Sequence, residues 1–164
     1  MEHGWHNKAM LSDSLTLAAN CGVRRMKAEA LNLVQGLSHP CADIFISYRD
    51  SQVISFEMKF SLVVNGFEND IEVAFDNPAT FIWENESYSQ IDLPDVLPKC
   101  SKGFSEWVYP FIEVKNSEWL KKYEGISSAY NDSKLRQYAL ISMNDLVMVL
   151  TAEEPQIKVL NEIA

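Results

Sequence analysis

The segment that decides the fold is ISFEMKFSLVV, residues 54–64. Its even-numbered positions are all apolar, whereas four of the five odd-numbered positions between them are polar or charged. This period of two is typical of a β-strand and differs from the period of 3.6 residues of an α-helix. One apolar and one polar face indicate an antiparallel sheet with core on one side and water on the other. We therefore predict that the even positions from Ile54 to Leu62 are buried and that Glu57 and Lys59 are exposed.

Turn signals and alternating segments predict further strands around this one. Asn65-Gly66 marks a turn, and apolar residues alternate again at 71, 73 and 75, so residues 53–64 and 70–76 predict a hairpin. Asp76-Asn77-Pro78 marks the next turn, before a strand at 80–84, and residues 43–48 predict a strand upstream. Four short strands in succession predict an antiparallel meander.

Helical spacing predicts helices before the meander. Ser12 or Asp13 can cap a short helix that ends at Gly22. A second pattern places Met26, Ala30, Leu33 and Leu37 on one face of a helix that Pro40 ends.

The C-terminal third predicts a mixture of strands and helices. Residues 107–114 and 135–141 have strand character, and Asn116 or Ser117 can cap a short helix between them. The sequence from Ser142 to Asp145 fits a capping box, which predicts a helix that offers Leu146, Val149 and Leu150 to the core. Residues 156–160 predict an edge strand.

Together these elements predict an α+β fold, an antiparallel β-sheet meander with helices packed on one face. The 164 residues fit a single domain spanning 1–164, with residues 1–25 open to being a loosely attached N-terminal extension. Met26 is an alternative translation start. No apolar run reaches the roughly 20 residues that cross a bilayer, and the N-terminus lacks signal-peptide character, so we expect a cytoplasmic protein with no membrane contact.

The charge distribution indicates the kind of partner. The net charge is −9, and residues 39–98 alone carry eleven acidic and two basic side chains. Because nucleic-acid binding requires a basic surface, we expect no nucleic-acid partner. An acidic surface attracts a basic protein, although acidic residues also serve solubility alone.

Few residues suggest catalysis or metal binding. The His3-x-x-His6 pair lacks two further ligands, and His39-Pro40-Cys41 reads as a structural turn. The odd number of cysteines, Cys21, Cys41 and Cys100, predicts unpaired reduced thiols. Nucleotide, hydrolase and zinc motifs are not found, so we expect no catalytic residue, cofactor or metal.

The segment 87–106 is a long irregular stretch broken by Pro94 and Pro98. A loop of this length is a candidate binding segment, and a loop that wraps the sheet edge is the alternative. The aromatic residues that follow it, including Trp107 and Tyr109, suit either an interface or the core.

Three stretches carry a resemblance to a known family. They are Arg136–Leu150 followed by Glu154-Pro155, the segment Trp83-Glu84-x-Glu86, and the segment from Trp107 to Phe111. Together they resemble a family of small uncharacterised bacterial proteins of accessory, cassette-type or immunity-like character. The chain departs from the family pattern at Gln137, where the family has His, and at Asn144. The resemblance implies an accessory role, such as a partner that neutralises a toxin.

The function expected from the sequence is that of a non-enzymatic cytoplasmic binding protein, immunity-like, that docks a protein partner on an acidic surface. A structural accessory protein that self-associates as a homo-oligomer, and a small-ligand enzyme without a recognisable motif, remain open as alternatives. The residues expected at the docking surface are Glu57, Glu72, Glu84, Glu86, Asp92, Asp95, Trp107 and Tyr109.

Overall fold

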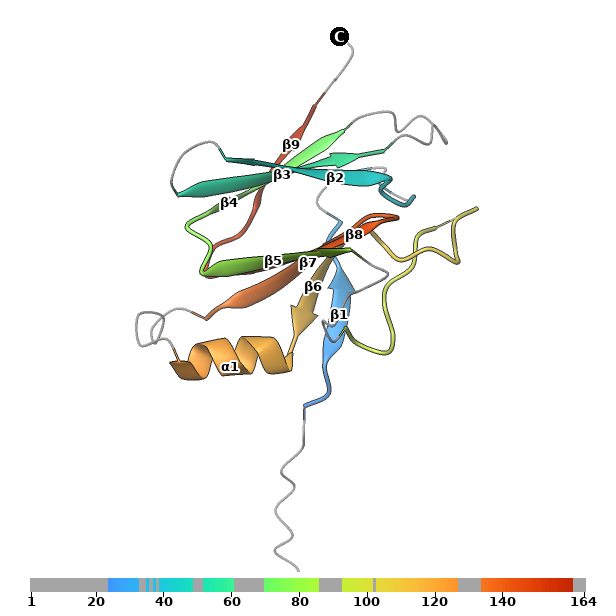
Figure 1. Cartoon of the computed structure of the whole chain (residues 1–164). Helices are drawn as coiled ribbons and strands as arrows, with labels where there is room; N and C mark the ends of the chain where they lie inside the picture. Colours follow the sequence, from blue (N-terminus) through green and yellow to red (C-terminus); the bar gives the residue numbers. More distant parts are fainter. Residues whose placement is uncertain are drawn as a thin grey trace, which may run out of the picture.

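The computed structural model describes residues 24–32, 35, 37, 39–48, 52–60, 70–85, 93–101, 103–126 and 134–160. These residues form two stacked antiparallel sheets and one helix (Figure 1). The four-stranded sheet has the order β2 (Asp43–Tyr48), β3 (Val53–Lys59), β4 (Ile71–Asp76) and β9 (Gln156–Val159). The five-stranded sheet has the order β1 (Lys27–Ala30), β6 (Phe111–Lys115), β7 (Arg136–Ile141), β8 (Asp145–Thr151) and β5 (Thr80–Asn85).

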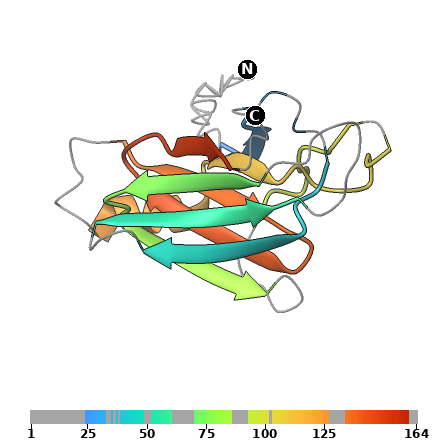
Figure 2. The same ribbon diagram turned by 90° about the horizontal axis from the view of Figure 1, so that it is seen from above.

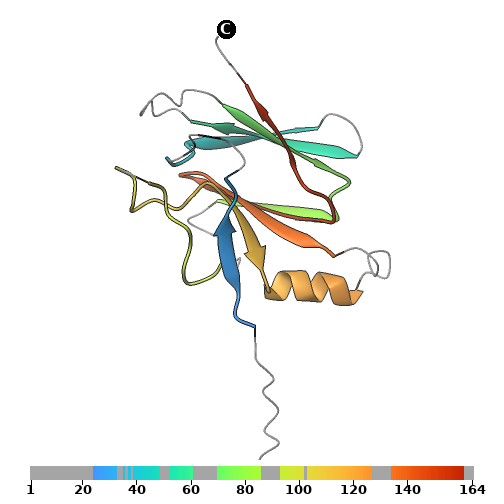
Figure 3. The same ribbon diagram turned by 180° about the vertical axis from the view of Figure 1, so that it is seen from behind.

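The predicted α+β fold, with several helices packed on one face of a single sheet, is wrong. Nine strands in two sheets make up about half of the described residues, and α1 (Glu118–Ile126) is the one helix among them. This helix lies on the side of the five-stranded sheet that faces away from the four-stranded sheet (Figures 1 and 3). The architecture is therefore a β-sandwich with a short helix on its outer side.

The strands β2, β3 and β4 confirm the antiparallel hairpins predicted from the period of two. Ile54, Phe56, Met58 and Phe60 are buried, and Glu57 and Lys59 remain partly exposed. Residues 61–69, including Leu62 and the predicted Asn65-Gly66 turn, lie outside the described residues. From above, β2, β3 and β4 lie side by side over the other sheet (Figure 2).

The predicted fourth strand of the meander exists, but it belongs to the other sheet. The chain leaves β4 at Asp76, turns through Asn77 and Pro78, and enters β5, which pairs with β8. Asn77 has a φ of 44°, in the left-handed region that asparagine tolerates better than most residues. The predicted turn is therefore confirmed, but it is a corner between two sheets, which a meander does not contain.

The predicted helix after Ser142 is wrong, because residues 145–151 form strand β8. β8 lies in the middle of the five-stranded sheet, and its residues from Leu146 to Thr151 are buried. One face of β8 packs against the four-stranded sheet, and the other points away from it. A strand buried on both faces has a continuous apolar sequence, which period counting cannot distinguish from a buried helix.

The capping chemistry predicted at Ser142 is real but serves a hairpin. The Ser142 hydroxyl accepts hydrogen bonds from the N–H groups of Asn144 (3.2 Å) and Asp145 (2.9 Å). These bonds close the tight turn between β7 and β8. A serine side chain makes the same bonds in a turn as at a helix start.

The predicted helix from Met26 to Leu37 is also wrong. Residues 27–30 form the edge strand β1, which pairs with β6 from Lys27↔Lys115 to Ala30↔Ile112. Pairing with β6 supplies backbone hydrogen bonds and buries Ala28 and Ala30 partly against the core, which outweighs the helical propensity of this segment. The other helix predicted in this region, between residues 12 and 22, lies outside the described residues.

The predicted helix cap at Ser117, the strand predicted at 135–141 and the edge strand predicted at 156–160 are confirmed. Ser117 is the residue before α1, and its hydroxyl accepts a hydrogen bond from the N–H of Leu120 at 3.0 Å. Tyr123 of α1 donates its hydroxyl hydrogen to the carbonyl of Ala79 at 2.8 Å, which ties the helix to the corner before β5. Within the described residues, no helix has the length and apolar character that a bilayer crossing requires.

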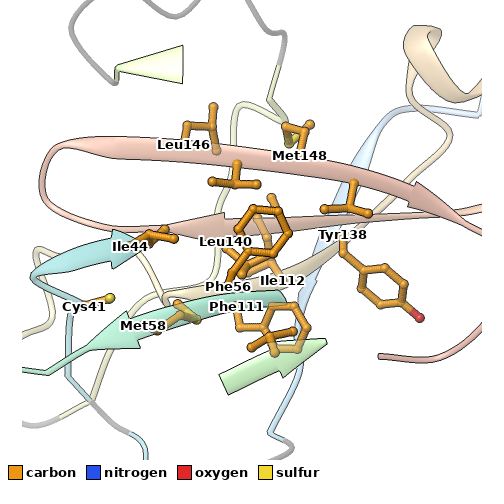
Figure 4. Packing of buried hydrophobic residues seen from close by; sticks show 14 of the residues in the cluster. Cys41, Ile44, Phe56, Met58, Phe111, Ile112, Tyr138, Leu140, Leu146 and Met148 are labelled. Atoms are coloured by element: carbon orange, nitrogen blue, oxygen red, sulfur yellow. The ribbon is translucent and has the colours of Figure 1, made fainter. Parts of the chain in front are cut away.

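The core lies between the two sheets and continues through the five-stranded sheet. Phe56 of β3 makes an edge contact with Phe81 of β5, with 6.0 Å between ring centroids, and Phe75 of β4 contacts Tyr138 of β7 at 5.7 Å. In Figure 4, Leu146 and Met148 extend to one side of β8, and Phe56 and Met58 lie on the other. The five-stranded sheet is thus buried on both faces at its centre. On the outer face of the four-stranded sheet, Ser55 and Ala74 are also buried, whereas Glu57 is partly exposed and Phe45 is exposed.

Candidate interaction surfaces

The outer face of the four-stranded sheet is the first candidate surface. Side chains alternate along a strand, so residues that pair across strands share a face. Glu57 pairs with Glu72, and both belong to the face opposite Phe56 and Val73, which are buried in the core. We call this surface the acidic face; its charged side chains are Asp43, Glu57, Lys59, Asp70, Glu72, Asp76 and Lys158. Five carboxylates and two lysines give it a net charge of −3.

One lysine neutralises part of the acidic face. The Lys59 ammonium lies 2.6 Å from the Asp70 carboxylate and also bonds Glu57. These hydrogen bonds, the Asp70 one foremost, raise the pKa of Lys59 above its usual value. Since partly exposed ion pairs stabilise a fold only slightly, the cluster contributes more to surface potential than to stability.

An exposed aromatic side chain lies beside these acids. Phe45 on the edge strand β2 is opposite Glu57 and is 53% exposed. Asp43 lies two residues away on the same face, where it accepts a hydrogen bond from the Asn144 side chain at 3.3 Å. Aromatic side chains flanked by charged groups are common at protein interfaces.

The structure brings together only part of the predicted docking surface. Glu57 and Glu72 are neighbours on the acidic face, although Glu72 is only 9% exposed. Glu84 of β5 pairs with Leu146 and belongs to the face of the five-stranded sheet that points away from the four-stranded sheet. Glu86 and Asp92 lie outside the described residues.

The remaining predicted residues lie beyond the acidic face. Asp95 lies in the segment after Leu93 that runs beside β1, and Trp107 is 45% exposed in the turn before β6. Tyr109 is 4% exposed, and burial raises the pKa of its hydroxyl to about 12. Tyr109 is therefore a core residue, whereas Trp107 is open to a partner.

A groove along β1 is the second candidate surface. Residues Arg25–Glu29 form one wall and Leu93–Val96 form the other, around a volume of about 660 Å³. We call this feature the β1 groove; it continues into a hollow of about 300 Å³ beside Arg24, Asn116 and Lys121. In Figures 1 and 3, β1 lies between β6 and the segment that contains the second wall.

The described cysteines are poorly suited to nucleophilic chemistry. Cys41 and Cys100 are free and buried, and burial raises their thiol pKa values to about 12 and about 11. The Cys41 thiol donates to the carbonyls of Asp43 (3.1 Å) and Lys59 (3.3 Å), bonds that only the protonated form can make. Because the thiolate is the reactive form, both groups are inert near neutral pH.

The described residues also offer little for metal chemistry. His39 is buried, its ring lies edge-on to Phe60 with 5.4 Å between centroids, and its Nδ1 donates to the Pro40 carbonyl at 3.4 Å. Within the described part of the chain, no group of three or more His, Cys, Asp or Glu side chains is placed to hold a metal ion. Cys21, His3 and His6 lie outside the described residues.

Sequence reasoning missed Phe45 and the β1 groove. Phe45 follows the strict alternation of β2, so its outward position could have been read from Ile44 and Ile46 on either side. The basic side chains at residues 24, 25 and 27 are adjacent in the sequence, but assigning this segment to a helix concealed the strand edge that they flank.

Comparison with protein-family models, with curated proteins and with solved structures finds no match to this chain.

Proposed function

We propose that this protein is a non-enzymatic binding protein that docks a basic protein partner on the acidic face. The single observation that carries the proposal is the exposed Phe45, which lies directly opposite Glu57 on a surface of net charge −3. An aromatic side chain supplies apolar contact area, and surrounding charges steer the encounter and select the partner.

The proposal places the protein in the cytoplasm, where an immunity-like role against a basic toxin is its most specific form. This placement rests on the sequence, and the role rests on the resemblance to small bacterial accessory proteins. The inert thiols of Cys41 and Cys100 also fit a binding role better than a catalytic one.

A specific observation supports self-association as a second candidate function. β2 is the outermost strand of its sheet and carries the exposed Phe45. An edge strand with an exposed apolar side chain can pair with the same strand of a second copy. Sedimentation velocity distinguishes the two functions by measuring whether the protein forms a dimer. If the edge of β2 forms the dimer, Phe45→Ser converts it to a monomer.

The test of partner docking begins with a photo-crosslinking amino acid at position 45, which captures the bound protein in cells. The association rate of the captured partner is then measured with the variant Asp43→Lys/Glu57→Lys. We expect a loss of about tenfold at low salt and a smaller loss at high salt, since salt screens exposed charges.

The matched control is Glu106→Lys/Glu153→Lys, which changes the net charge equally at exposed positions away from the acidic face. Retention of the association rate in this control shows that the position of the charge matters. Equal losses in both variants, or none in either, would contradict docking on the acidic face.

A further inference from the structure

Within the part of the chain that the structure describes, the outer edge of β1 presents backbone groups without a hydrogen-bond partner to the β1 groove. The N–H of Leu31 donates to the Phe111 carbonyl at 3.0 Å, so the backbone groups of residue 31 point toward β6. Directions alternate along an antiparallel strand, and therefore the N–H and C=O groups of Met26, Ala28 and Ala30 point away from β6. Among the described residues, none provides a hydrogen bond to these groups.

The opposite wall does not satisfy this edge. It consists of Leu93, Pro94, Asp95 and Val96, of which Pro94 has no backbone N–H. Val96 is 81% exposed at the mouth, where it offers an apolar contact to an incoming chain. The groove thus combines an open strand edge with an apolar wall, as peptide-binding sites that add a strand do.

Among the residues that the structure describes, the unpaired charges beside the groove are mostly positive, whereas the net charge of the whole chain is negative. Glu29 is paired with Lys115 at 2.6 Å, and Glu118 is paired with Lys121 at 2.6 Å. No described residue forms an ion pair with Arg24, Arg25 or Lys27. Asp95 is the remaining acid of the two walls, so the groove has three uncompensated cations against one carboxylate.

We propose that the β1 groove binds an extended, acidic segment of a partner protein, which adds to the free edge of β1 as a sixth strand. Main-chain hydrogen bonds to Met26, Ala28 and Ala30 hold the segment, and Arg24, Arg25 and Lys27 select acidic side chains. The site is separate from the acidic face, and it prefers the opposite charge, so the two proposals stand or fall independently.

Hydrogen exchange on the unaltered protein tests the geometry. The probe is a fluorescein-labelled peptide of alternating Glu and Val, and NMR measures the exchange rate of each amide. We expect the amides of Met26, Ala28 and Ala30 to slow at least tenfold on peptide addition, whereas those of Lys27 and Glu29, which already face β6, change little. Binding without this alternating pattern would overturn strand addition.

A proline substitution tests the same contact by affinity. Ala28→Pro removes an outward N–H at an edge strand, where proline is tolerated, and Ala28→Ser is the matched control that keeps the N–H. We expect Ala28→Pro to weaken peptide binding at least tenfold and Ala28→Ser to leave it unchanged, with melting curves of both variants confirming the fold. Equal affinity of the two folded variants would overturn the proposal, and the exchange experiment decides if the proline variant does not fold.

Charge and occupant are tested with other probes. The variant Arg25→Glu/Lys27→Glu is expected to lose the acidic peptide and to bind the peptide of alternating Lys and Val instead. Equal binding of both peptides by the unaltered protein would overturn the charge preference. Tighter binding of polyphosphate than of the acidic peptide would identify a general polyanion site. Protection of the Ala28 amide from exchange that rises with protein concentration alone would identify a second copy of the chain as the occupant. Either result would overturn the peptide proposal.

Discussion

Ser117 connects the start of α1 to the centre of the five-stranded sheet. Its hydroxyl accepts the N–H of Leu120 at 3.0 Å and donates to the side-chain oxygen of the buried Gln137. The Gln137 amide nitrogen in turn lies 3.8 Å from the Met148 sulfur. Gln137 therefore has a structural role in seating the helix.

We expect Ser117→Ala to lower the free energy of unfolding by about 1–3 kcal/mol, because it removes a helix cap and leaves the Gln137 oxygen without its donor. Urea titration followed by circular dichroism measures the change. Ser105→Ala, at an exposed turn, is the control and is expected to change stability by less than about 0.5 kcal/mol. A loss no larger than that of the control would show that the Ser117 bonds contribute nothing.

β8 shows how burial on two faces differs from burial on one. Val149 pairs with Tyr138 and Phe81 and faces the four-stranded sheet, whereas its neighbour Met148 pairs with Ala139 and Ile82 and faces away. Both side chains are fully buried. We therefore expect Val149→Asp and Met148→Asp each to cost more than about 4 kcal/mol and to prevent folding, since both place an unpaired charge in the interior.

Lys134→Asp is the control for these two changes, because Lys134 is exposed just before β7. Soluble expression and near-ultraviolet circular dichroism compare the three variants. If only one of the two β8 variants failed to fold, β8 would have a water-facing side and the sandwich described here would be wrong.

Local periodicity predicted some elements and not others, for a physical reason. β2, β3 and β4 alternate because one of their faces lies outside the core, and a single sequence records that alternation. The sequence of β8 shows no such alternation, because both of its faces are buried. β1 is a short segment whose strand conformation depends on pairing with β6, whose paired residues lie 82 or more positions further along the chain. Elements defined by a distant partner cannot be recognised from their own residues.

At the scale of the whole molecule, the arrangement of two sheets was likewise inaccessible to local patterns. Nothing in residues 76–80 distinguishes a hairpin turn from the corner that carries the chain from β4 to β5. The same limit applies to the surfaces. The pairing of Glu57 with Glu72 was predictable from the hairpin, whereas the separation of Glu84 from them follows from the change of sheet.

The sandwich interior contains a tyrosine hydroxyl and a cysteine thiol that stay protonated while they are buried. Burial raises the pKa of Tyr138 from its ordinary 10.0 to about 12 and that of the Cys41 thiol from 9.0 to about 12. The unfolded chain releases these protons at lower pH than the folded protein does, so stability is fully present below about pH 9 and falls as the pH rises toward 12.

We expect alkaline unfolding in this range, with the phenolate absorbance of the buried tyrosines appearing together with the loss of near-ultraviolet circular dichroism. Tyr138→Phe is expected to reduce the pH slope of the free energy of unfolding, and Tyr123→Phe, whose hydroxyl lies at the partly exposed helix, serves as the comparison. Phenolate absorbance that rises completely before the structure is lost would contradict the burial of these hydroxyls.

The change of sheet at Asn77 also has a consequence for synthesis on the ribosome. β2, β3 and β4 emerge before the strands that cover their inner face, and the last of these, β8, ends only at Thr151, 75 residues after Asp76. At about 5–20 residues per second, translation leaves that apolar face uncovered for roughly 4–15 seconds. During this interval the nascent chain exposes the apolar face of one sheet before the other sheet is complete. We expect a chaperone that binds apolar segments to act on the nascent chain mainly in this interval.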